Sequence, residues 1–183
     1  MSTFAEEYDI LEEQWKSGKR DIQVTRKLLF INWYVFVESS VSGMWKAPPY
    51  LKQIWPELLS IVETSAQNDL ESALVLGHMI QIYPFYFGDE DEWLRKSQTL
   101  YEIAYRIAEE QNRTTNELSM IGCFLASAIE NVKRNQSSGC VEDDEESEVD
   151  ESFFDEENYG YFTDMFLGTS EYDRYFGWIF GCK

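Results

Sequence analysis

The chain has 183 residues, of which 44% are hydrophobic and 27% are charged, so it is long enough and apolar enough to form one globular domain with a substantial core. Its formal net charge at pH 7 is −19, because 34 acidic residues stand against only 15 basic ones. So negative a chain repels phosphate, which argues against direct binding to nucleic acid or to anionic membranes and favours a basic protein as partner.

Apolar side chains recur at helical spacing through the first 133 residues. A capping-box pattern, Thr3 with Glu6, precedes the first segment, which Gly18 ends. A second segment spans about Asp21 to Ser40, and its centre from Phe30 to Val37 is rich in β-branched and aromatic residues that also suit a buried strand. We favour a buried helix there, because no partner strand or hairpin turn is evident nearby.

Prolines mark the boundaries of the next two segments. Pro48 and Pro49 open a third helix, in which Pro56 either delays the start or introduces a kink. A fourth helix is predicted from about Asp69 to Tyr83, ended by Pro84.

Two longer helices follow. The fifth has one apolar side, formed by Trp93, Leu100, Ala104, Ile107 and Ala108. Thr114 and Glu117 form a second capping-box pattern. The clearest helical stripe of the chain lies behind it, at Leu118, Ile121, Leu125, Ala128, Ile129 and Val132. The sequence therefore predicts an all-α fold, either a helical bundle or an irregular stack of helical hairpins.

The simplest organisation is a single domain over residues 1–183, in three parts. Residues 1–134 form the helical body, and residues 135–152 are expected to be an acidic flexible loop because they have little to bury. Residues 153–183 form an aromatic-rich C-terminal segment. Ser170 is a candidate cap for a short helix there, while the glycines of this segment leave strands open as an alternative.

No catalytic constellation is evident. The single histidine, His78, lies on a mostly apolar helix without a recognisable nucleophile or orienting partner, which favours a structural role. Cys123, Cys140 and Cys182 lack metal-ligand spacing and are expected to be reduced thiols. The acidic run at 89–92 suits the start of a helix better than a calcium site. We therefore expect no enzymatic activity, no cofactor and no bound metal.

The most unusual stretch is VEDDEESEVDESFFDEEN at residues 141–158, where eleven of eighteen residues are acidic and none is basic. A solvated linker would account for the charge alone. The aromatic residues interleaved with the acids favour an interface, since rings anchor protein contacts and carboxylates engage Arg and Lys. The predicted partner-binding residues are Asp143, Asp144, Glu145, Glu146, Glu148, Asp150, Glu151, Phe154, Asp155, Glu156, Glu157, Tyr159 and Tyr161.

With its high negative charge, its acidic and aromatic stretch VEDDEESEVDESFFDEENYGYF and its lack of a secretion signal, the chain resembles the immunity proteins of bacterial toxin systems. That resemblance implies a cytoplasmic inhibitor that binds and neutralises a basic cognate toxin, commonly a nuclease domain. Two alternatives stay open. One is a nucleic-acid mimic that inhibits a defence enzyme, and the other is a helical adaptor or scaffold in which the acidic run is only a linker.

Overall fold

The computed structural model describes residues 4–37, 48–137, 162, 165–166 and 168–180. Within these ranges the chain forms helices, turns and bends and contains no strand, which confirms the predicted all-α class. The α-helices are α1 (Phe4–Lys16), α2 (Ile22–Val37), α4 (Pro49–Ala66), α5 (Leu70–Ile82), α6 (Glu90–Glu110), α7 (Thr115–Ser137) and α8 (Glu171–Ile179), and a short 3₁₀ helix, η1 (Pro84–Tyr86), follows α5.

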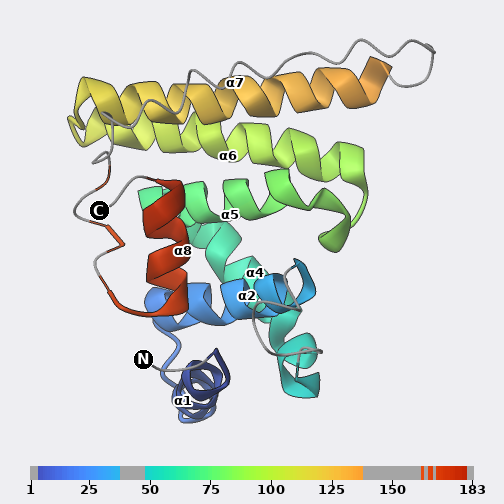
Figure 1. The fold of residues 1–183 in the computed structure, drawn as a ribbon, viewed down its shortest axis with the longest axis vertical. Helices are drawn as coiled ribbons and strands as arrows, with labels where there is room; N and C mark the ends of the chain where they lie inside the picture. The colour runs from blue at the N-terminus through green and yellow to red at the C-terminus, as the bar shows by residue number, and fades with distance from the viewer. Residues whose placement is uncertain (1–3, 38–47, 138–161, 163–164, 167, 181–183) are drawn as a thin grey trace.

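The helices form a stack in which each packs on the next in chain order (Figure 1). In that view the stack runs from α1 at the bottom to α6 and α7 at the top. The last helix, α8, stands along one side and returns the C-terminal segment to α2. The arrangement is consistent with the all-α helical bundle or irregular stack of helical hairpins that the sequence predicts.

The core is centred on α2 and α5. Most residues of α2 are buried, and every residue from Leu70 to Ile80 except Glu71 is buried. The stretch from Phe30 to Val37 is therefore the helix that we favoured over a strand, buried along most of its length but with Phe36 exposed near its end. Asp21 starts α2, because its carboxylate accepts a hydrogen bond from Val24 N at 2.9 Å.

Two boundaries set by proline are settled by the structure. α4 begins at Pro49 and continues through Pro56, so the alternative of a later start at Pro56 is wrong. Pro56 has no N–H group to donate to the carbonyl of Lys52. Both residues are exposed. α5 ends at Ile82, directly before Tyr83 and Pro84, as predicted.

Side-chain caps fix the starts of the later helices. Thr114 and Glu117 form the predicted capping box of α7, with Thr114 N donating to Glu117 Oε2 at 2.7 Å and Glu117 N donating to Thr114 Oγ1 at 3.3 Å. Asp89 caps α6 by accepting from Glu92 N at 3.0 Å, so the acidic run at 89–92 does begin a helix. Ser170 caps α8.

Aromatic packing holds α8 in place. Its buried rings Tyr172 and Phe176, with Phe180 directly after it, face α2 and α5. Phe30 of α2 lies 5.7 Å from Tyr172 and 5.3 Å from Phe176, in edge-to-face geometry between ring centroids. The described end of the aromatic-rich segment is therefore a helix that completes the core.

The capping box gives a stability prediction. Thr114→Ala removes the hydroxyl that bonds Glu117 N, and we expect the free energy of unfolding to fall by about 1 kcal/mol. Thr115→Ala is the matched control, because Thr115 is the exposed first residue of α7 and alanine is the better helix former. Urea unfolding of both variants measures the difference. Equal stabilities would contradict the assigned cap.

Candidate functional site

Large apolar side chains are exposed where α2, α5 and η1 meet. Phe36 near the end of α2 is 56% exposed and Phe85 in η1 is 64% exposed. Tyr83 links them, with its ring centroid 5.5 Å from that of Phe36 and 6.3 Å from that of Phe85. Ile82, next to Tyr83, is also exposed. We call Phe36, Ile82, Tyr83 and Phe85 the Phe85 surface.

The chain turns sharply here, and the turn presents these side chains outward. Pro84 cannot continue α5 and instead begins η1. The inner side of the turn is held by Tyr86, whose hydroxyl donates to Asn32 O at 3.2 Å. Gly88 follows with φ of +154°, and a Cβ at this position would lie 2.7 Å from Trp93 Nε1. A side chain at position 88 would clash with Trp93, which favours glycine at this turn.

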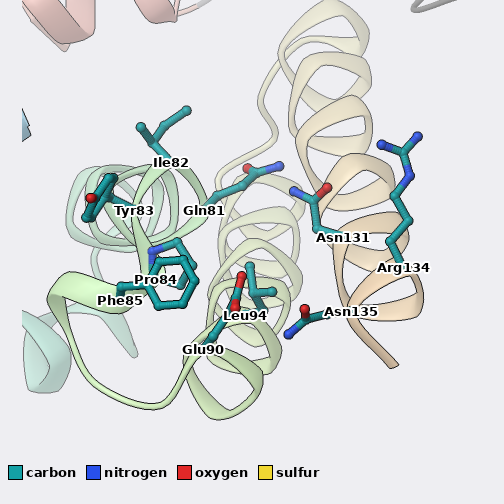
Figure 2. Close-up of a pocket in the computed structure, with 10 residues that line it drawn as sticks. All are labelled: Gln81, Ile82, Tyr83, Pro84, Phe85, Glu90, Leu94, Asn131, Arg134 and Asn135. Atoms are coloured by element: carbon teal, nitrogen blue, oxygen red, sulfur yellow. The ribbon is translucent and has the colours of Figure 1, made fainter. Parts of the chain in front are cut away.

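A cavity of about 390 Å³ adjoins the Phe85 surface (Figure 2). Ile82, Tyr83 and Phe85 belong to both. Figure 2 shows Pro84 and Phe85 on one side of it, the α7 residues on the other, and Glu90 and Leu94 of α6 between them. Its lining residues are Gln81, Ile82, Tyr83, Pro84, Phe85, Glu90, Leu94, Asn131, Arg134 and Asn135.

Some polar groups that line the cavity are bonded to side chains outside it. Gln81 Nε2 donates to Ser127 Oγ at 2.8 Å, which leaves Gln81 Oε1 buried and without a hydrogen-bond partner. Arg134 Nη2 lies 2.8 Å from Glu130 Oε1, one turn earlier on α7. Glu90 has no ion-pair partner within the described residues. The cavity therefore combines one carboxylate, one guanidinium and three side-chain amides with apolar walls.

A second polar cluster lies in the core, where α2, α5 and α8 meet. Arg26 is only 2% exposed, and its guanidinium contacts Asp69 Oδ2 at 2.6 Å and Glu71 Oε2 at 2.9 Å. Tyr172 OH of α8 donates to Glu71 Oε1 at 2.7 Å. Nearby, Lys27 Nζ lies 3.0 Å from Asp173 Oδ2. We call Arg26, Asp69, Glu71 and Tyr172 the Arg26 network.

Burial governs the ionisation of this network. It raises the pKa of the Glu71 carboxyl, although the positive charge of Arg26 opposes the shift. It also raises the pKa of the Tyr172 hydroxyl, with the negative charge of Glu71 acting in the same direction. All the charges of the network are used within the fold, so its role here is to join three helices.

His78 is likewise a group of the core. It is 4% exposed, and its Nε2 lies 3.1 Å from the hydroxyl of Tyr175. Aromatic rings surround it, with Phe176 and Phe180 at centroid distances of 5.9 Å and 6.0 Å. Burial lowers its pKa to about 4, which keeps the imidazole neutral at pH 7. This is the environment expected of a structural histidine.

The described residues, within 4–37, 48–137, 162, 165–166 and 168–180, also bear on metal binding and on membrane spanning. No group of three or more His, Cys, Asp or Glu residues in those ranges is placed to hold a metal ion. None of the helices there has the length and apolar character that crossing a bilayer requires. Cys123 is exposed on α7 as a free thiol.

The residues predicted to bind a partner, from Asp143 to Tyr161, all lie outside the described residues, so the structure does not place them. What the sequence reasoning missed is the Phe85 surface. A signal for it was present in IYPFYFG at residues 82–88, where aromatic residues flank a helix-ending proline. Because a turn lies at the molecular surface, rings in such a run have less chance of being covered.

Comparison with known proteins does not identify a relative. No protein-family model, characterised protein or solved structure matches the chain.

The buried histidine gives a prediction for the pH dependence of stability. Unfolded His78 has a pKa near 6.5, while the folded group titrates at about 4, so the unfolded chain binds the extra proton as the pH falls. The stabilisation is complete above about pH 6.5 and is lost towards pH 4, at up to about 1.4 kcal/mol per pH unit.

His78→Gln removes this component. The variant is expected to be less stable than the wild type at pH 7, because the core is disturbed, but the difference should shrink as the pH is lowered to 5. Urea unfolding of both proteins at several pH values measures this. A difference that stays constant with pH would show that His78 is not held neutral by burial.

Proposed function

We propose that this protein is an inhibitor of a basic protein, of the kind represented by toxin immunity proteins. The observation that carries the proposal is the Phe85 surface, a set of adjoining exposed apolar side chains on a chain with a net charge of −19. Exposed apolar side chains that adjoin one another mark interaction sites more often than scattered ones do.

The Phe85 surface has the composition of an interface centre. Phe36, Tyr83 and Phe85 are aromatic, and aromatic side chains supply a large share of the binding energy at protein interfaces. Each gains contact area when a partner covers it while losing little conformational entropy, since a ring has only two side-chain torsions. Acidic residues begin α6 beside this surface, with Glu90 in the adjoining cavity.

The charge selects the partner. Carboxylates on a protein surface form charge-assisted hydrogen bonds with Arg and Lys, and a strong negative potential speeds the encounter with a basic protein. We place residues 141–157 in this steering role, with the rings of the Phe85 surface holding the complex once it has formed. A nuclease domain is the favoured target, because the surface that binds nucleic acid must itself be basic. An inhibitor seated there would exclude the substrate.

The first test concerns the rings. In toxin immunity systems the immunity gene directly follows the toxin gene, so the product of the neighbouring gene is the partner to test. Phe85→Ala should weaken binding to this partner by about 2 kcal/mol or more, mainly through faster dissociation. Because Phe85 is 64% exposed, the stability of the free protein should change by less than about 0.5 kcal/mol. Trp178→Ala is the matched control, since Trp178 is 63% exposed but lies on α8.

The readout is binding kinetics together with the enzymatic activity of the partner in the presence of each variant. Loss of inhibition with Phe85→Ala and full inhibition with Trp178→Ala support the proposal. If the wild-type protein binds the neighbouring gene product without inhibiting it, an adaptor takes the place of an inhibitor. If the two variants bind as the wild type does, the Phe85 surface is not the interface.

The second test concerns the charge. Reversing Glu145, Glu146, Asp155 and Glu156 to Lys should slow association with the same partner and flatten its dependence on ionic strength, because screening limits surface charges to about 8 Å at physiological salt. Stopped-flow association at low and physiological salt measures both effects. Association that is independent of salt, with full affinity after deletion of residues 141–157, would mean that this run is a linker.

A further inference from the structure

We propose that α8 is an acid-sensitive latch, which leaves α2 and α5 as one unit when His78 takes up a proton, while the stack of the other helices stays folded. In Figure 1 α8 stands beside the stack and reaches from the level of α5 to that of α2. Three features support the proposal, namely the way in which α8 is attached, the cover that it places over His78, and the direction in which acid changes the charge there.

The attachment of α8 differs from that of the other helices. The others pack on their neighbours in chain order, as α5 does on α4 and α6, whereas α8 packs on α2. The chain just before α8 folds back onto it, since the ring of Phe166 lies 5.7 Å from that of Phe176 and 5.6 Å from that of Phe180. We call Phe166 and residues 170–180 the α8 unit. Removing this unit leaves the contacts among the other helices in place, so it can open separately from them.

Two tyrosines of α8 tie it to two titratable side chains of α5. Tyr172 OH donates to Glu71 Oε1 at 2.7 Å. Tyr175 OH lies 3.1 Å from Nε2 of His78. The tyrosines follow each other by one turn of α8, and their partners by two turns of α5, so each pair lies on one helix face. The polar attachment of α8 to α5 therefore depends on the protonation of α5 side chains.

The cover over the imidazole of His78 comes mostly from the α8 unit. The rings of Tyr175, Phe176 and Phe180 lie at centroid distances of 5.8 Å, 5.9 Å and 6.0 Å. α7 adds the ring of Phe124 at 6.4 Å. Burial among these rings lowers the pKa of the imidazole to about 4. Release of the α8 unit removes three of these four rings and returns the imidazole to water.

The direction of the charge change favours release in acid. Once α8 has left, we expect the pKa of His78 to return from about 4 towards its ordinary value of about 6.5. Between these values the open form binds a proton that the docked form does not, so each fall of one pH unit favours opening by up to about tenfold.

Glu71 acts in the opposite direction. Burial raises the pKa of its carboxyl, so the docked form holds a proton there more readily than the open form does. The guanidinium of Arg26 stays beside Glu71 after release, at 2.9 Å, because both belong to helices of the stack. Only part of the shift of Glu71 therefore depends on α8, and the effect of His78 is the larger of the two.

The other titratable groups around His78 are two tyrosines and an ion pair. Tyr175 on α8 and the buried Tyr101 on α6 carry phenols that stay protonated below pH 7. Lys27 of α2 and Asp173 of α8 are paired across the same interface, with Nζ 3.0 Å from Oδ2. A proton on His78 adds a buried charge that these groups do not neutralise, which is costly while α8 stays docked.

Release of the α8 unit also uncovers an apolar side chain of α2. Phe30 is 0% exposed, with the rings of Tyr172 and Phe176 at 5.7 Å and 5.3 Å. The opened protein therefore presents an additional apolar surface in acid, and such surfaces take part in binding.

Amide hydrogen exchange of the full-length protein at pH 7 and pH 5 tests the latch, after correction for the intrinsic effect of pH on exchange. α6 is the reference for opening of the whole molecule, because its buried side lies within the stack. We expect α8 to be less protected than α6 at both pH values. Protection of α8 should fall by about five- to twentyfold between pH 7 and pH 5, the upper value being that for His78 without the opposing effect of Glu71. Equal protection of α8 and α6 would overturn the latch, because the protein would then open only as a whole.

Two variants remove the titrating group in different ways, so that one can be measured if the other does not fold. In both His78→Gln and His78→Phe, protection of α8 should no longer fall between pH 7 and pH 5. Tyr175→Phe is the matched control, because it removes the hydroxyl beside Nε2 but keeps a ring there and the imidazole itself. It should lower the protection of α8 at both pH values and retain the fall. A fall that persists without His78, or that is lost in Tyr175→Phe, would overturn His78 as the group that responds to acid.

Discussion

The buried guanidinium of Arg26 is the constraint on which the arrangement of the helices depends. A charge that is 2% exposed must be paired and hydrogen-bonded within the fold, because removing one partner of a buried pair leaves an uncompensated charge. Asp69, which contacts this guanidinium, also caps α5 by accepting from Ser72 N at 2.8 Å. The side chain that starts α5 is thus the one that fixes it against α2. Glu71 extends the same network to α8 through Tyr172.

The two ends of α5 are consequently of different character. Its N-terminal end is tied to α2 and α8 by charge and by hydrogen bonds. Its C-terminal end is stopped by Pro84, and the chain turns outward there with Phe85 exposed. Since the middle of α5 is buried on all sides, the helix has little freedom to shift between these ends. Ile82 therefore ends, and Tyr83 and Phe85 closely follow, a helix whose other end is held by the Arg26 network.

Local signals in the sequence were sufficient to predict the helices but not the surface. Helical periodicity located most of the segments, and the capping side chains Thr114 and Ser170 marked two starts correctly, because both signals act over a few residues. Whether an aromatic ring is exposed depends instead on segments that are distant in the sequence. Phe30 and Phe36 lie on the same helix and have the same chemistry, yet Phe30 is buried and Phe36 is 56% exposed. What covers Phe30 is α8, more than a hundred residues away in the chain.

The same limit applies to His78, whose hydrogen-bond partner Tyr175 is 97 residues away. No spacing rule within one helix could identify that partner, although the apolar neighbours of His78 in sequence indicated burial. The cavity is harder still, since its walls come from α5, η1, α6 and α7 and its unpaired acceptor is defined only by where Gln81 points. Side chains that act together across helices are visible only after the helices are packed.

Ion pairs within the molecule neutralise only part of its negative charge. Arg20, Lys96 and Arg106 each pair with a carboxylate of a helix, as Arg26 and Lys27 do in the core. Even if every Lys and Arg were paired in this way, the net charge of −19 would remain as unmatched carboxylates. Their mutual repulsion opposes the compact state, and it is relieved when a cationic surface approaches. The negative surplus that the fold cannot neutralise and the exposed rings of the Phe85 surface are the two features on which the proposed binding of a basic protein rests.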